Sequence, residues 1–165
     1  MLRNKNLIPL SHQHQHALAL CVRIERASLT SPIPDADLDA WRSEIELLWQ
    51  SEIAIHFAAE ERVLFPAARR FSELAPLVDE LLADHGSLSE NFTQVTTMSA
   101  KDLVTFARNL SAHIREEERQ LFEQLQKLID HEGLTVLGKQ LEEALKDATQ
   151  ACALPKTATA LRSVK

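Results

Sequence analysis

One motif occurs twice in this sequence and strongly constrains what the chain can fold into. Residues 56–66 read HFAAEERVLFP and residues 113–123 read HIREEERQLFE, so six of the eleven positions are identical. Each copy sets a histidine four residues before a glutamate, and side chains four apart are neighbours on one face of an α-helix. Each copy therefore predicts a helix that directs an imidazole and a carboxylate at one place. The two pairs are His56 with Glu60 and His113 with Glu117.

The rest of the sequence predicts an all-helical protein. Its 165 residues include only 3 glycines, and 45% of them are hydrophobic, a composition that suits helices. Apolar residues recur at helical spacing over four long segments and a shorter fifth one. Short connections favour an up-down-up-down four-helix bundle with the short C-terminal fifth helix packed outside. The expected helices are residues 11–28, 37–70, 74–98, 100–133 and 134–150.

Two residues mark expected helix boundaries. Ser11 is the expected N-cap of the first helix, and Pro66 is expected to kink or end the second, because proline lacks the backbone donor. Residues 1–150 are expected to form one domain, and residues 151–165 a flexible C-terminal tail.

Charge and hydropathy exclude several classes of function. The net charge of −6 argues against nucleic acid as a partner, because phosphate binding requires a basic surface. No apolar run approaches the roughly 20 residues of a membrane span. The N-terminus has three histidines where a signal peptide needs an apolar stretch, and the two cysteines form no CxxC pair. These features predict a cytoplasmic protein.

The other two long helices each offer one inward histidine. His85 lies on a leucine-rich face of the third helix. On the first helix we favour His14, which shares a face with Ala17 and Cys21, over His12 and His16. A lone histidine on an apolar face is more often a core residue. Here, however, four helices contribute one histidine each, and the two buried carboxylates would be unpaired charges unless a cation neutralised them. The candidate metal ligands are His14, His56, Glu60, His85, His113 and Glu117.

Six nitrogen and oxygen ligands exceed the needs of one tetrahedral ion and suit two metals bridged by carboxylates. Imidazole with carboxylate is compatible with iron, manganese or zinc.

Further polar residues have expected supporting roles. The second glutamate of each motif, Glu61 or Glu118, is the alternative ligand to Glu60 or Glu117. We expect it to point away instead and to pair with an arginine: Arg62, Arg115 or Arg119. Glu52 and Asn109, four residues before the motif histidines, are expected to orient those rings.

Two other residues have structural interpretations. His131 is expected to stabilise the C-terminal end of the fourth helix, and Cys21 to be a core residue.

With these residues the chain resembles the hemerythrin family, in its HHE cation-binding branch. The resemblance covers about residues 7–132 and rests on SHQHQHAL, the two repeated stretches and ADHGSL. It implies a bundle around a non-haem di-iron centre, with the six candidate ligands holding two iron ions. It also implies that dioxygen or another small diatomic is the partner, in binding, sensing or redox chemistry.

One position departs from the family's oxygen carriers. They have a second histidine one turn after the ligand corresponding to His85, and this chain has Ser89 there, so reversible oxygen carriage is less favoured than sensing or redox chemistry. The absence of tyrosine excludes a tyrosyl radical. Alternatives are a ferritin-like iron-handling or oxidase protein, and a structural bundle that is zinc-bound or metal-free. The acidic bundle is also compatible with a homodimer.

Overall fold

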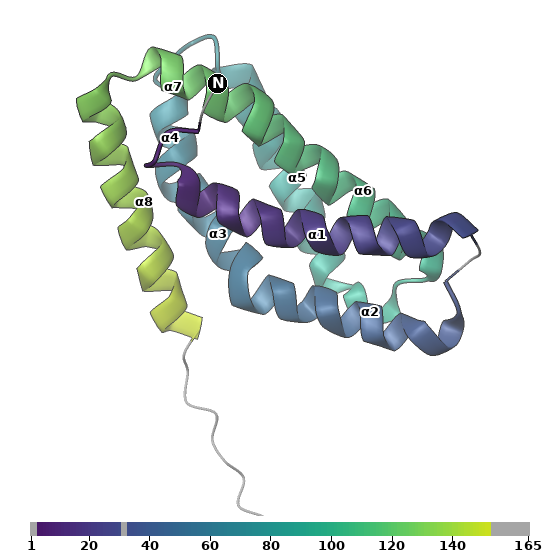
Figure 1. The fold of residues 1–165 in the computed structure, drawn as a ribbon. Coiled ribbons are helices and arrows are strands. Elements are labelled where there is room, and N and C mark those ends of the chain that lie inside the picture. Colours follow the sequence, from purple (N-terminus) through teal and green to yellow (C-terminus); the bar gives the residue numbers. More distant parts are fainter. Residues whose placement is uncertain (1–2, 31–32, 153–165) are drawn as a thin grey trace, which may run out of the picture.

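The structure, a computed structural model, describes residues 3–30 and 33–152, and all of its regular elements are helices (Figure 1). No strand occurs in these ranges, which confirms the all-α prediction. The predicted flexible tail, residues 151–165, lies almost entirely outside the described residues.

The first helix, α1, spans Ile8–Thr30 and begins before the predicted cap at Ser11. Pro9 lies in its first turn, where a missing backbone N–H breaks no helical hydrogen bond. Buried side chains recur along one side of α1 and include Leu10, Ala17 and Ile24. This apolar stripe, rather than Ser11, decides where α1 packs.

The second long helical run is continuous from Asp35 to Ala68 but changes its hydrogen-bond pattern. It comprises α2 (Asp35–Leu48), η1 (Trp49–Ile53), α3 (Ala54–Ala59), η2 (Glu60–Leu64) and α4 (Phe65–Ala68). Both η1 and η2 are π-helical turns, which close hydrogen bonds to the fifth residue instead of the fourth. The run continues through Pro66 and ends two residues later, so this proline lies in the last helical segment.

The third and fourth runs follow the predicted order. The third run comprises α5 (Ala75–Thr93) and a short 3₁₀ turn, η3 (Val95–Thr97). The fourth comprises α6 (Ala100–Glu116), the π-helical η4 (Glu117–Leu121) and α7 (Phe122–Leu128). Ser99 begins α6 with a capping box: its hydroxyl accepts the Asp102 N–H, and the Asp102 carboxylate accepts the Ser99 N–H.

The predicted end of the fourth run at Gly133 is wrong. The run ends at Leu128, because Ile129 is extended, with φ −95° and ψ 131°. The next helix, α8 (His131–Cys152), starts almost at once, and Asp130 Oδ1 accepts the Gly133 N–H at 2.7 Å. His131 therefore begins α8 instead of stabilising the end of the preceding helix, since an aspartate cap outweighs the weak stop signal of one glycine.

The core consists of two apolar clusters separated by a polar layer. Leu10, Leu64, Leu81 and Leu121 belong to one cluster. The other contains Ala17, Ile53, Leu88 and Leu110, and each of the four long runs contributes to both. Because the candidate ligands lie between these positions on every run, they form a layer across the middle of the core.

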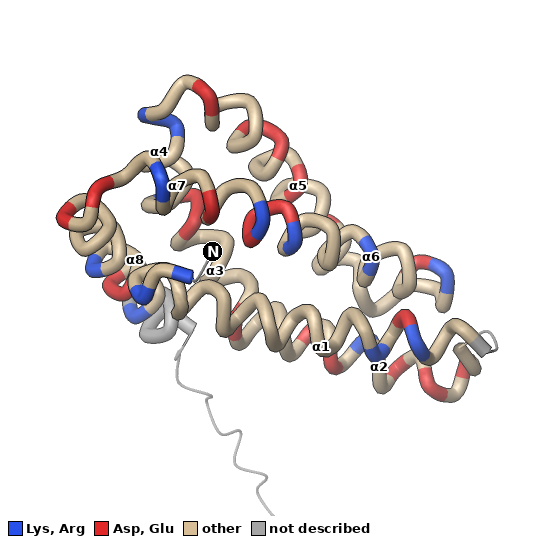
Figure 2. Tube along the Cα trace, turned by 45° about the horizontal axis from the view of Figure 1, so that its top comes forward, with Lys and Arg blue, Asp and Glu red and all other residues tan. Residues whose placement is uncertain are grey.

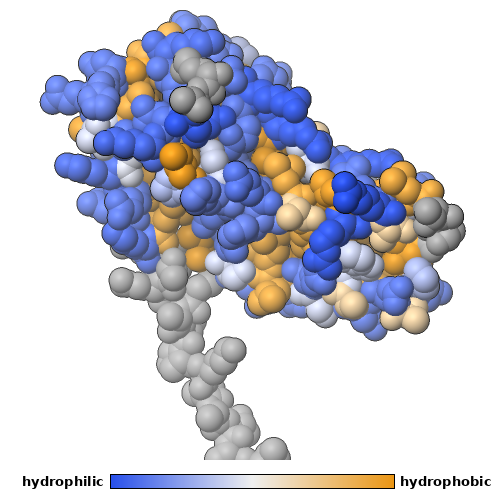
Figure 3. All heavy atoms as spheres, in the orientation of Figure 1, coloured by the Kyte–Doolittle hydropathy of each residue, from blue (hydrophilic) through white to orange (hydrophobic). Residues whose placement is uncertain are grey.

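The last helix, α8, packs against the outside of the second run. Its inner side carries the buried residues Leu134, Leu137 and Leu141. Acidic and basic residues are interspersed along the helical runs (Figure 2). Apolar side chains gather on the visible face mainly where α1 and α2 lie (Figure 3). None of the described helices is long and apolar enough to cross a membrane.

Candidate metal centre

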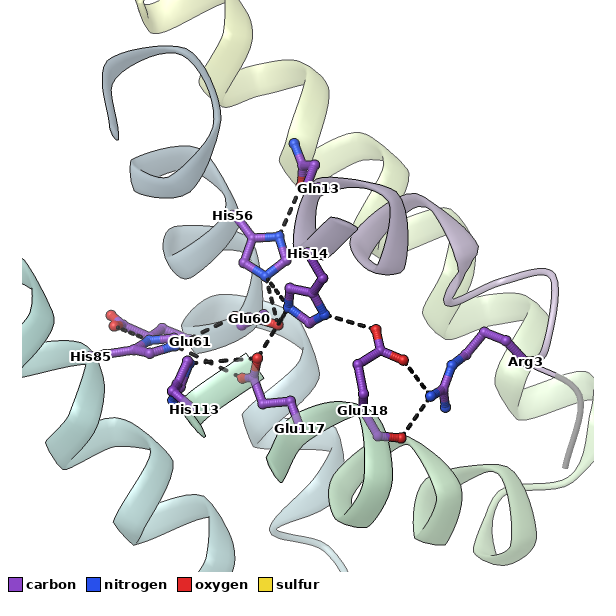
Figure 4. A network of polar contacts seen from close by, with 10 residues as sticks. All are labelled: Arg3, Gln13, His14, His56, Glu60, Glu61, His85, His113, Glu117 and Glu118. Carbon is purple, nitrogen blue, oxygen red and sulfur yellow. Dashed lines mark hydrogen bonds and ion pairs between the residues drawn. The ribbon is translucent and has the colours of Figure 1, made fainter. Parts of the chain in front are cut away.

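All six candidate ligands converge in the polar layer (Figure 4). Each is at most 2% exposed, although each carries an ionisable group. His14 comes from α1 and His85 from α5, while the two repeated motifs supply the other four. A buried set of this kind is costly unless its charges and lone pairs are satisfied. The set is His14, His56, Glu60, His85, His113 and Glu117.

Each buried carboxylate lies between histidines of different helical runs. Glu60 Oε1 is 3.1 Å from His56 Nε2, and Glu60 Oε2 is 3.5 Å from His85 Nε2. Glu117 Oε2 is 3.1 Å from His14 Nε2 and 3.5 Å from His113 Nε2. Both carboxylates therefore connect the His14–His56 side of the layer with the His85–His113 side.

The ligand atoms form two groups, each of suitable size for a cation. The first group is His14, His56, Glu60 and Glu117, and the second is His85, His113 and Glu117; within each, the ligand atoms lie within 4.8 Å of one another. Glu117 belongs to both groups. The arrangement could hold one cation on each side with a shared carboxylate.

The outer nitrogen of every histidine faces an oxygen acceptor. His14 Nδ1 donates to Glu118 Oε1 at 2.8 Å, and His85 Nδ1 donates to Glu61 Oε1 at 2.9 Å. His56 Nδ1 is 2.9 Å from Gln13 Oε1, and His113 Nδ1 is 3.4 Å from Asp84 Oδ2. Because carboxylate and amide oxygens only accept, the Nδ1 atoms of His14, His56 and His85 carry protons. Nε2 of each ring points into the layer, where His14 Nε2 and His56 Nε2 lie 2.8 Å apart. In a neutral ring protonated at Nδ1, this nitrogen has the lone pair that metal ligation requires.

These outer contacts repeat with the same pattern in both motifs. The second glutamate of each motif crosses to the histidine of a neighbouring run, so the predicted pairing with arginines 62, 115 and 119 is wrong. The residue preceding that histidine, Gln13 or Asp84, faces the motif histidine in turn. The layer thus has an approximate twofold relation that exchanges α1 with α5 and one motif with the other.

The residues expected to orient the motif histidines do something else. Glu52 accepts a hydrogen bond from the exposed His16 at 2.9 Å, and Asn109 is exposed on α6. Both lie one turn before their histidine on the same helix, whereas the observed acceptors come from a neighbouring helix. Sequence spacing within one helix could not reveal them.

Phenylalanine rings enclose the histidines, a role that was not predicted from the sequence. Phe57 stacks on His85 with ring centroids 3.7 Å apart, and Phe65 lies 5.1 Å from the same ring. Phe122 stacks on His14 at 5.6 Å. The recurring Leu-Phe of the two motifs was the available signal, since it supplies Phe65 and Phe122 at equivalent positions.

A π-helical turn begins at the inward glutamate of both motifs. The Phe65 N–H bonds to the Glu60 carbonyl, and the Phe122 N–H bonds to the Glu117 carbonyl, each five residues back. The first motif ends in Pro66, and the equivalent residue of the second motif is Glu123. Because both motifs form the wide turn, Pro66 is not its cause. Such turns are frequent at functional sites because they reposition side chains without ending a helix.

The buried histidines and carboxylates of the layer shift one another's pKa values. Burial lowers the pKa of His14, but Glu117 and Glu118 outweigh it and raise the pKa to about 10. Burial also opposes charge on His85, whose pKa is nevertheless raised, chiefly by Glu60. The pKa of Glu60 is lowered in spite of complete burial, because His56 and His85 stabilise its negative charge. Without a cation, protons on the histidines balance the carboxylates.

Several inward atoms have no hydrogen-bond partner among the described residues. They include both carboxylate oxygens of Glu60 and of Glu117, His85 Nε2 and His113 Nε2. Buried polar atoms are rarely left in this condition. A cation in the layer would satisfy them, so the residues present fit a metal.

The fold and the layer together define an all-helical protein with a buried histidine–carboxylate cluster that could hold a metal. The Hemerythrin HHE cation binding domain matches residues 9–125, and the chain belongs to this family. No curated protein and no solved structure matched the chain significantly.

Proposed function

We propose that this protein binds two iron ions in the polar layer and uses them in oxygen binding, sensing or redox chemistry. The proposed ligands are the six buried residues, His14, His56, Glu60, His85, His113 and Glu117. We also propose the up-down-up-down bundle, which short connections between the four long runs favour. Manganese or zinc would suit the same donor atoms.

The observation that carries the proposal is the orientation of the four imidazoles. Each ring presents Nδ1 to an oxygen acceptor outside the layer and Nε2 to the buried carboxylates. A histidine that only fills a core needs one satisfied polar contact, and nothing requires its second ring nitrogen to face a buried carboxylate. Four rings with this orientation, around carboxylates that lack other partners, support ligation.

The protein's own residues would perform three tasks. Glu60 and Glu117 neutralise cationic charge from both sides of the layer. Gln13, Glu61, Asp84 and Glu118 keep the imidazoles in the tautomer that leaves Nε2 free. The rings of Phe57, Phe65 and Phe122, which pack on the histidines, exclude bulk water from them and so lower the local dielectric.

Bound iron would supply one-electron redox chemistry and affinity for dioxygen or another small diatomic. Ser89 offers no nitrogen one turn after His85, so the His85–His113 side has fewer protein ligands. This difference favours sensing or redox chemistry over reversible oxygen carriage.

The test is anaerobic reconstitution with Fe²⁺, a count of bound metal, and absorption spectra before and after exposure to air. Two irons per chain and new near-ultraviolet bands after air are the expected result. His56→Ala and His113→Ala should each lose metal, whereas His12→Ala, an exposed histidine of α1, should bind like the wild type. Retention of a single colourless ion, or of no iron, would contradict the proposal and favour a structural role.

A further inference from the structure

One residue near the N-terminus contacts both side chains that hold His14 from outside. Arg3 Nη2 donates to the Glu118 carboxylate and, at 2.6 Å, to the Glu118 carbonyl (Figure 4). Its guanidinium carbon is 4.9 Å from the centre of the Phe122 ring. Glu118 accepts the His14 Nδ1–H, and Phe122 stacks on the same imidazole. Arg3 therefore completes a three-residue support for one imidazole of the layer.

The segment that carries Arg3 is itself anchored to the helices. The Asn4 N–H donates to Gln126 Oε1, and Leu7 is fully buried in the cluster that includes Phe122. The Asn6 side chain approaches α8 so closely that a Cβ at Gly138 would lie 2.6 Å from Asn6 Cβ. Residues 4–7 are thus held against α7 and α8 by contacts other than that of Arg3.

No equivalent cation supports the other three acceptors among the described residues. Glu61 and Asp84 are the counterparts of Glu118 and Gln13 in the twofold relation, and they are 46% and 49% exposed. Glu118 is 23% exposed and lies against Arg3. Since Arg3 also falls outside residues 9–125, this support does not belong to the part of the chain that matches the family.

We propose that Arg3 is a positioning residue, which acts through Glu118 and Phe122 to orient His14 and strengthens cation binding on the His14–His56 side of the layer. This proposal rests on the proposed metal binding. The two-point contact holds Glu118 in one rotamer and prevents the carboxylate from turning to solvent, which would leave the buried His14 Nδ1–H without its acceptor. Loss of an outer partner of a metal-bound histidine typically weakens binding 10–100-fold. Arg3 lies one contact further out, so we expect about a tenfold effect, at the lower end of that range.

The test is a stepwise titration of the metal-free protein with Co²⁺, followed by its visible absorption bands. Arg3→Ala should weaken binding of one Co²⁺ by about tenfold and change its band shape, while the second Co²⁺ binds as in the wild type. Arg3→Lys keeps the charge but loses the planar guanidinium that lies over Phe122, and should recover part of the affinity. Lys5→Ala removes an exposed charge from the same segment and should bind both ions normally.

A second readout does not depend on metal. In ¹⁵N NMR spectra of the metal-free protein, Arg3→Ala should move the ring signals of His14 and leave those of His85 in place. If those signals and the Co²⁺ affinity both stay unchanged, Arg3 is not a positioning residue. Equal weakening at both positions would also overturn the proposal, because it would indicate general loosening of the fold. If the wild type binds no Co²⁺, the claim about cation affinity fails with the proposed function, and the NMR comparison still decides whether Arg3 orients His14.

Discussion

The two halves of the polar layer are built alike but supported differently. In each half, a motif glutamate holds the histidine of a neighbouring helix, and the phenylalanine of the same motif packs on that ring. Glu61 and Phe65 do this for His85, and Glu118 and Phe122 do it for His14. Among the residues that the structure describes, only the His14 half has a cation, Arg3, behind its glutamate. The repeated motif therefore explains the shared geometry, while residues outside the motif create the difference.

The acceptors of the two motif histidines also differ between the halves. His56 faces the neutral amide of Gln13, and His113 faces the carboxylate of Asp84. An acidic acceptor makes an imidazole a stronger donor to a metal than an amide does. The His85–His113 side thus has fewer ligands, and both of its outer acceptors are partly exposed carboxylates. The His14–His56 side has more ligands, and its outer acceptors are an amide and a carboxylate paired with Arg3.

The largest expected effect comes from a residue that both halves share. Glu117 belongs to both ligand groups, so Glu117→Gln should weaken the binding of both cations by about 100-fold or more. The effect should be this large because losing a charged ligand costs more affinity than losing an outer partner. Metal counting after dialysis measures this. Glu116→Gln, the adjacent residue outside the layer, should retain both ions. If Glu117→Gln lost only one ion, the two halves would be independent sites.

An intermediate effect concerns pH and the metal-free protein. The pKa of His14 is raised to about 10, so its protonation stabilises the fold fully below its unfolded pKa of about 6.5. This contribution, up to about 5 kcal/mol, is lost as the pH rises through the folded pKa. Urea unfolding at pH 6.5 and at pH 10 should show the loss, and His14→Gln should largely remove it.

Metal affinity should change with pH in the opposite direction from the stability of the metal-free protein. A metal must displace the protons on the histidines, so affinity should increase as the pH rises. An NMR titration of the imidazoles would compare the halves directly, because the pKa of His85 is also raised. A His14 midpoint below 6.5 would contradict this account of the layer.

The smallest expected effect tests the aromatic support of each half. Phe65→Leu and Phe122→Leu each remove a ring that packs on a histidine, and each should lower the free energy of unfolding by about 1 kcal/mol. Chemical denaturation of the metal-free variants measures both values. Equal losses would support the twofold relation, and a loss from only one variant would show that the two rings are not equivalent.

The sequence by itself determined the helical class and the inward residues. Helical spacing is local: it places His56 and Glu60 on one face whatever the neighbouring helices are, and the same holds for His113 and Glu117. Apolar residues on the same face then require that face to be buried. Composition and periodicity were sufficient for these conclusions, although the end of the fourth run was misplaced because Asp130 caps the next helix.

Only the tertiary structure decided what lies behind each imidazole. Glu118 is 104 residues from His14, and Gln13 is 43 residues from His56. No periodicity relates such positions, since their contact depends on how far each helix is rotated and shifted against its neighbour. The wide turns at Glu60 and Glu117 add a further change that an ideal α-helix does not predict. Local spacing thus identifies which side chains enter the layer, and packing between helices determines how each of them is held.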